Sequence, residues 1–146
     1  MNAKYVPASL SAKDKKKQIA NLKKAQQAYK EGVYISRPQL SSFTTKGSSH
    51  IKKAKTIYGV SSINPSKELA KKTGCSLTTL KKIVEKGKGA YYSSGSRPNQ
   101  TPSSWGLARL ASAITGGKSA GVDFHLLKAG CKPSSKPVVL AKNKKK

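Results

Sequence analysis

Apolar residues are widely spaced along this chain, and most of the spacing fits short helices. The first helix is predicted over 11–32, where Ser11 is placed to cap the start. Its apolar residues Ile19, Leu22 and Tyr29 fall on one narrow stripe, and lysines cover most of the remaining surface. We expect a long basic helix whose single apolar seam docks on another subunit.

The segment 33–50 shows no helical period. Its β-branched and aromatic start at 33–35 indicates extended backbone, and Pro38 disfavours helix at the residue before it. The rest is rich in Ser, Thr and Gly, which is typical of a linker that lies along another surface. A short helix is then expected in 51–59, ending at Gly59.

Clearer helix signals begin at residue 64. The expected helices cover 66–73, 76–86, 102–115 and 119–130. Most begin at Ser or Pro and end at Gly, with Gly87 and Gly89 ending the second one. A polar loop is expected to reach Thr101. Trp105 lies on the helix that follows and should face the core of the domain. In the last of these helices we expect Val122 to be buried.

The predicted fold class is all-α. A small helical domain over 56–131 contains a helix-turn-helix-like corner. A long basic N-terminal helix and an extended linker form 1–55. The end, 132–146, contains two prolines, one short apolar patch and a lysine terminus, so we expect a basic C-terminal arm rather than a fold element.

Charge changes this picture more than any other property. The chain has 30 Lys+Arg against 5 Asp+Glu, a formal net charge of +25. It therefore requires an anionic partner or a dense assembly to offset its self-repulsion. The arginines are Arg37, Arg97 and Arg109, and all other basic residues are lysines. Lysine is a hydrated point charge, so the composition favours diffuse attraction over reading of base edges.

Two cysteines are too few for a secreted disulfide framework. Cys75 and Cys131 each follow a glycine at a predicted helix end, which favours buried, reduced thiols over a bond between the two. No apolar run of about 18 residues exists, and the first ten residues lack a signal-peptide core. We expect a soluble protein on the cytoplasmic side of membranes.

The segment 66–87 has the layout of a helix-turn-helix, with Ala70 at the close approach and Gly74 in the turn. If it reads DNA, the exposed face of the second helix offers Ser76, Thr78, Thr79, Lys81 and Lys82. The absence of Arg, Asn and Gln from that face favours a purely structural helix pair, because those side chains make the strongest base contacts.

The region 91–101 concentrates aromatic and polar side chains. We expect a partner-binding surface, or its scaffold, made of Tyr91, Tyr92, Arg97, Asn99 and Gln100, with Arg109 from the next helix nearby. A phosphate at the helix start over 102–104 is an alternative. Against it, polar side chains in irregular loops commonly bond to their own backbone.

Catalysis and metal binding find little support. His50 lies in the linker, and His125 is expected to point away from Asp123. Two Cys and two His lack zinc spacing, so no metal and no cofactor are predicted. The sequence "GGKS" at 116–119 lacks the earlier glycine of a phosphate-binding loop. An enzyme built on the 91–101 loop is a third hypothesis, which requires Arg97→Ala to abolish a turnover without harming assembly.

The stretch "GAYYSSGSRPNQT" followed by "SWGLARLASAITGGK" resembles a small domain that recurs in proteins of large eukaryotic DNA viruses, including algal and amoebal ones, and in some phages. The resemblance covers roughly 58–131 and implies a viral setting but no catalytic residues. In that setting the chain is similar to a minor capsid protein that clamps major capsomers from the inner side.

This resemblance implies the major capsid protein and other minor capsid proteins as partners, and the virion as location, with host cytoplasm during assembly. Proximity to an inner viral membrane is compatible with it. The alternative is a virion DNA-binding or DNA-condensing protein that uses the helix-turn-helix-like segment and the lysine arms.

Overall fold

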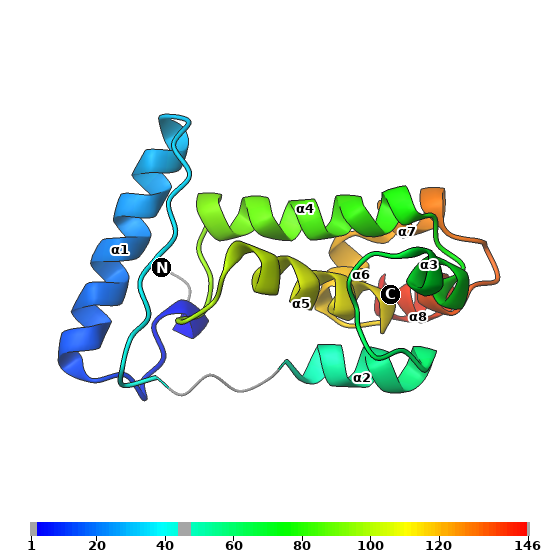
Figure 1. The fold of residues 1–146 in the computed structure, drawn as a ribbon, viewed down its shortest axis with the longest axis horizontal. Helices are drawn as coiled ribbons and strands as arrows, with labels where there is room; N and C mark the ends of the chain where they lie inside the picture. The colour runs from blue at the N-terminus through cyan, green and yellow to red at the C-terminus, as the bar shows by residue number, and fades with distance from the viewer. Residues whose placement is uncertain (1–2, 44–47, 146) are drawn as a thin grey trace. The chain divides into compact units, whose positions relative to one another are not determined.

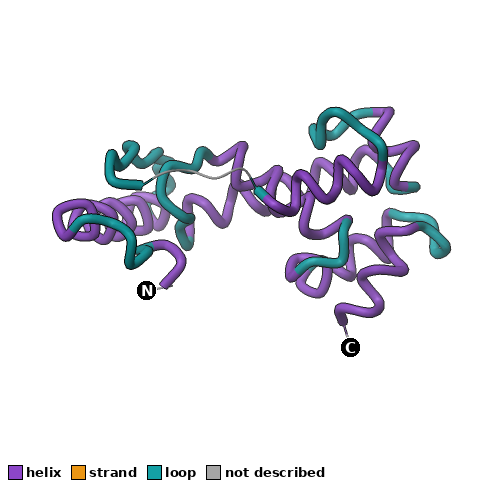
Figure 2. Tube along the Cα trace, turned by 90° about the horizontal axis from the view of Figure 1, so that it is seen from below, coloured by secondary structure: helices purple, strands orange, loops and turns teal. Residues whose placement is uncertain are grey.

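The computed structural model describes residues 3–43 and 48–145, and within them only helix and loop occur apart from one isolated bridge (Figure 2). The prediction of an all-α fold is confirmed. The helices are α1 (Ala12–Lys30), α2 (Ser49–Tyr58), α3 (Lys67–Thr73), α4 (Leu77–Ser93), α5 (Pro102–Ile114), α6 (Lys118–Val122), α7 (Phe124–Gly130) and α8 (Lys136–Lys145), and a 3-10 turn covers Ala3–Tyr5.

The chain forms two compact units. Unit 1 comprises Met1–Lys46 and Lys88–Trp105, and unit 2 comprises Gly47–Gly87 and Gly106–Lys146. This division differs from the predicted one, because α4 and α5 each contribute to both units and the region 88–105 joins the N-terminal helix.

In unit 1, the extended segment that follows α1 runs back along that helix (Figure 1). The buried positions of α1 include Gln18 and Leu22. Gln18 donates to the backbone oxygens of Tyr5 and Ser96, so an amide occupies the centre of the packed face. Of the predicted docking seam, Leu22 is buried within unit 1, so its predicted contact with another subunit is wrong, whereas Ile19 and Tyr29 lie at the surface.

The start of α1 is capped as predicted and is also fastened to the distant segment 41–43. The Ser11 hydroxyl accepts from the Asp14 backbone N–H at 3.1 Å. Asp14 in turn accepts from the backbone N–H and the hydroxyl of Ser42, and the Ser11 N–H donates to the Ser42 hydroxyl. These bonds from Ser42 hold the pKa of Asp14 below its ordinary value, because they favour the carboxylate.

Unit 2 contains the larger core, with fully buried residues that include Leu80, Ile83, Leu110 and Ile114. Tyr58, at the end of α2, donates its hydroxyl to the Ile114 backbone oxygen. Burial raises the pKa of Tyr58, so this hydroxyl keeps its proton.

Helix α4 continues through Gly87 and Gly89 to Ser93, beyond the predicted end at residue 86. The reason for Gly87 is packing: a Cβ built there would lie 2.5 Å from the Gly106 Cα. The two glycines let the backbones of α4 and α5 approach more closely than any side chain permits. Gly87 is therefore a contact residue and not a helix stop.

The single helix predicted over 119–130 is broken at Asp123 into α6 and α7. Asp123 is fully buried, and its backbone N–H donates to the Ser119 oxygen. The break turns Val122 outward to 59% exposure, so its predicted burial is wrong. Leu127 occupies the core instead.

The predicted C-terminal arm is also helical. Residues 136–145 form α8, and Val138 and Ala141 are buried in the core of unit 2. Pro137 is tolerated because it lies in the first turn, where a backbone N–H has no helical partner.

Cys75 and Cys131 form a disulfide and face each other across an isolated antiparallel bridge, which corrects the expectation of reduced thiols. The Ser76 N–H donates to the Gly130 oxygen, and the Lys132 N–H donates to the Gly74 oxygen. The turn between α3 and α4 is thereby tied to the chain that leads into α8.

Candidate functional site

The α3–α4 corner has the features of a helix-turn-helix. The Ser66 hydroxyl caps α3, and Gly74 ends it in the left-handed conformation at φ +77°. Leu69, Leu80 and Ile83 are buried, and Leu77 is half-buried. The corner therefore presents the opposite side of α4 to solvent.

Four of the five residues predicted to face nucleic acid lie on that exposed side: Ser76, Thr78, Lys81 and Lys82. Thr79 does not, because it is buried beside Gly130. Its hydroxyl lies 2.8 Å from the Ser76 hydroxyl, and its backbone N–H donates to the same Ser76 oxygen. Thr79 thus belongs to the helix cap and is corrected from contact residue to structural residue.

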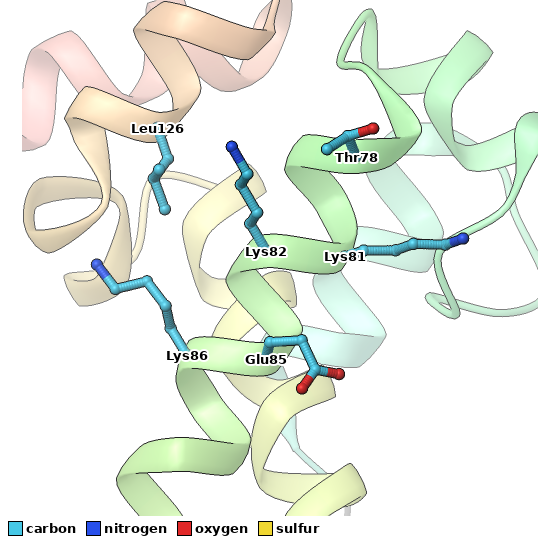
Figure 3. Close-up of a pocket in the computed structure, with 6 residues that line it drawn as sticks. All are labelled: Thr78, Lys81, Lys82, Glu85, Lys86 and Leu126. Atoms are coloured by element: carbon cyan, nitrogen blue, oxygen red, sulfur yellow. The ribbon is translucent and has the colours of Figure 1, made fainter.

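An open pocket of about 500 Å³ lies along this side of α4 (Figure 3). Its lining comprises Thr78, Lys81, Lys82, Glu85 and Lys86 of α4 and Leu126 of α7. Lys82 and Lys86 point toward the side on which Leu126 lies, and Lys81 points the opposite way (Figure 3). Lys86 is also paired with Asp123, so the excess positive charge that attracts anions comes from Lys81 and Lys82 against Glu85.

A buried ion pair supports α4 from within unit 2. Arg109 donates to both carboxylate oxygens of Asp123, at 2.9 and 2.8 Å, and Lys86 lies 3.4 Å from the same carboxylate. The pKa of Arg109 is raised by its hydrogen bonds to that carboxylate. Arg109, predicted to bind a partner, is therefore engaged inside the fold.

The loop 94–101 is likewise held by internal bonds. Asn99 has a positive φ of 62°, and its side chain accepts from the Leu40 N–H and donates to the Leu40 and Phe43 oxygens. The Gln100 side chain accepts from the Ser104 hydroxyl. These predicted partner residues position the loop, whereas Arg97 is exposed.

Arg37 organises the same region and was not predicted to do so. Its guanidinium lies 3.9 Å from the centre of the Tyr91 ring. It donates to the Tyr91 backbone oxygen and to the Ser96 hydroxyl. Its backbone N–H donates to the Tyr91 hydroxyl. Desolvation lowers the pKa of Arg37. Tyr91, predicted to face a partner, is buried.

Three tyrosines from separate segments of unit 1 stack on one another. The Tyr34 ring stacks on that of Tyr29, with centroids 5.5 Å and planes 29° apart, and on that of Tyr92, with centroids 5.1 Å and planes 28° apart. We call Tyr29, Tyr34 and Tyr92 the tyrosine column. Tyr29 and Tyr92 were predicted as contact residues, and the position of Tyr34 had no signal beyond its place in an extended segment.

Trp105 was expected in the core and is only half-buried. Its ring meets the Tyr5 ring edge-on, with centroids 6.1 Å apart. Within residues 3–43 and 48–145, no three His, Cys, Asp or Glu residues gather closely enough to hold a metal ion. Among the described helices, none combines the length and apolar character that a membrane crossing needs.

The model of a family described as a family of unknown function, DUF5824, matches residues 4–126. No curated protein and no solved structure is significantly similar to the chain.

Proposed function

The chain belongs to the DUF5824 family, and we propose that it is a non-enzymatic structural protein of a large DNA virus particle. In this proposal it acts as a minor capsid protein that joins major capsomers from the inner side of the shell. Its partners are the major capsid protein and other minor capsid proteins.

The observation that carries the proposal is the placement of the acidic residues. Asp14 and Asp123 are buried and bonded to internal groups, so the acids at the surface are Glu31, Glu68 and Glu85. The basic residues of the described chain are exposed over most helices. Such a surface is suited to many simultaneous weak contacts with an acidic face.

The resemblance of residues 58–131 to a domain of large DNA viruses supports the choice of a virus particle as the setting. The resemblance carries no catalytic residues. No metal cluster is present among the described residues either, although this does not decide whether the chain has an activity.

Fractionation of purified particles tests this function. Particles are opened with mild detergent, the genome is digested with nuclease, and the shell is collected by sedimentation. We expect the protein to sediment with the shell after complete removal of DNA and to leave it only at high salt. Release together with the digested genome would overturn the proposal.

The lysine-lined side of α4 favours a second candidate, binding of duplex DNA. Thr78, Lys81 and Lys82 are exposed on the second helix of a helix-turn-helix-like corner. Phosphate contacts by lysine release counterions, so affinity should fall steeply as salt rises.

A salt series on duplex DNA tests the second candidate. The slope of log affinity against log salt is negative. The double variant Lys81→Ala/Lys82→Ala should make it less steep by about 2, since each lost phosphate contact removes about 0.9. The matched control is Lys16→Ala/Lys17→Ala, which removes the same charge from exposed positions of α1. Equal slopes for the two variants would exclude α4 as the DNA-contacting helix.

A further inference from the structure

Three of the large hydrophobic side chains that the described surface exposes lie close together in sequence at the end of α1 and just after it. Tyr34 is 65% exposed, Val33 is 51% exposed and Tyr29 is 37% exposed. Two of them belong to the tyrosine column. We propose that the tyrosine column, with Val33, is the docking surface for an acidic protein segment that carries apolar side chains.

Contacts within unit 1 hold the tyrosine column in place. Tyr92 meets the buried Tyr91 ring edge-on, at 5.3 Å and 88°. Tyr91 is fixed by the stacked guanidinium of Arg37 and by the Arg37 backbone N–H. A partner therefore gains apolar contact without immobilising freely rotating side chains, which is a main cost of association. Tyrosine is enriched at the residues that dominate binding energy in protein interfaces.

The stacking geometry favours a protein over a nucleic acid. A base binds an aromatic residue by stacking on a free ring face. Tyr34 stacks on Tyr29 and on Tyr92, so ring faces that a base would need are engaged within the column. Tyr34, the most exposed member, lies next in sequence to the aliphatic Val33, and the two suit the apolar side chains of a protein.

Charge around the column favours an acidic partner. Lys23, Lys24 and Lys30 are exposed on the half of α1 that leads to Tyr29. The acidic residues of unit 1 are Asp14, which is bonded to Ser42, and Glu31, which accepts from the Gln27 amide. An acidic rim on the partner would therefore meet lysines around an apolar centre, the usual arrangement of a protein interface.

This inference deepens the proposed capsid role, and its identification with capsid partners rests on that role. The surface itself is tested with defined probes and the full chain. The probes are a labelled peptide of glutamate and leucine, a matched peptide with alanine in place of each leucine, and oligothymidylate. Affinity is measured by fluorescence anisotropy.

We expect Tyr34→Ala to weaken binding of the glutamate–leucine peptide by about tenfold or more, as for a central interface residue. Binding of the glutamate–alanine peptide should change less than about twofold, since only general charge attraction holds it. Tyr34→Phe should bind like the unmodified chain. Ile19→Ala, an exposed apolar change on α1 outside the column, is the matched control and should have no effect.

Circular dichroism melting of each variant shows whether folding is retained, and Tyr34→Phe keeps the ring if Tyr34→Ala melts early. Unchanged affinity of Tyr34→Ala for the glutamate–leucine peptide would overturn the inference. A larger loss for oligothymidylate than for this peptide would also overturn it, because the column would then serve a nucleic acid.

A particle experiment separates this inference from the proposed function. Tagged copies are expressed during infection and their incorporation is compared. Reduced incorporation of Tyr34→Ala, with normal incorporation of Ile19→Ala, supports the column as the docking surface. Absence of the unmodified chain from particles would overturn the capsid role, while the peptide titration would still decide the chemistry of the column.

Discussion

The buried carboxylates of this lysine-rich chain are bonded to groups of the same chain. Asp123 is fully buried, and its carboxylate is matched by the two-point contact with Arg109 and by Lys86. Removing one member of a buried ion pair costs more than the pair contributes, because it leaves an uncompensated charge in the interior.

The two arginines on either side of Trp105 allow a matched test. Arg109→Ala should lower the free energy of unfolding by about 3 kcal/mol, since Asp123 would keep only the longer contact with Lys86. Arg97→Ala, at an exposed site, should change it by less than about 0.5 kcal/mol. Urea denaturation followed by circular dichroism measures both. Equal effects would show that Asp123 does not depend on Arg109.

The Asp14–Ser42 contact makes a prediction about pH. The folded-state pKa of Asp14 is lowered from 3.8 by the hydrogen bonds from Ser42, so its stabilisation is present above 3.8 and is lost as the pH falls through the lower value. Ser42→Ala should therefore reduce the melting temperature near neutral pH. The difference from the unmodified chain should shrink as the pH falls through the lowered pKa of Asp14, because the protonated carboxyl no longer accepts both bonds from Ser42. A difference independent of pH would contradict this assignment.

At the level of helices, glycine has two opposite roles in this chain. Gly74 ends α3 in a left-handed conformation, whereas Gly87 lies inside α4 and permits the close approach to Gly106. Gly89, two residues further along the same helix, has no atom within 4 Å of the position that a Cβ would occupy.

This contrast predicts stability changes of opposite sign within one helix. Gly89→Ala should stabilise by about 0.5–1 kcal/mol, because alanine favours the helix. Gly87→Ala should destabilise by about 1–3 kcal/mol, because its Cβ meets the Gly106 backbone, which has no flexible end to move aside. Urea midpoints of the two single variants provide the measurement. Stabilisation by both would show that the helices do not meet at Gly87.

Local signals in the sequence were sufficient where one residue determines one helix end. Ser11, Ser66, Pro102, Gly59 and Gly74 begin or end helices as predicted. The predictions failed where the role of a residue depends on contact with a distant part of the chain. Gly87 looks like a helix stop in the sequence, and only its contact with Gly106 explains it. In α8, the lysines and the proline suggest a disordered arm, and only the spacing of Val138 and Ala141 indicates a packed helix.

The candidate site was predictable in part for the same reason. Lys81 and Lys82 follow from helical periodicity alone, and they are exposed. The roles of Asn99 and Arg37 depend on contacts with residues more than fifty positions away in sequence, which no local pattern reveals. The stacking of Tyr34 on Tyr92, also more than fifty positions away, has the same origin.

For the whole molecule, the Cys75–Cys131 bond is the main covalent constraint. It closes a segment with a sequence separation of 56, which corresponds to about 4 kcal/mol in the loop-entropy description. It joins the α3–α4 turn to the chain just before α8 and lies partly beyond the residues that the family match covers.

Reduction should therefore lower the free energy of unfolding by about 4 kcal/mol. Urea unfolding with and without dithiothreitol measures the change, and the double variant Cys75→Ala/Cys131→Ala should not respond to the reductant. Thiol alkylation under native conditions would reveal free cysteines. Rapid labelling of the untreated protein would disprove the bond.

The same bond has a consequence for timing. Glutathione keeps protein thiols reduced in the cytosol, and disulfides persist once a protein reaches an oxidising environment. Under the proposed function, a newly made copy would carry two thiols, and a copy in a released particle would carry the crosslink between the α3–α4 turn and the chain before α8. The fraction of chains with free thiols would then distinguish newly made protein from protein in released particles.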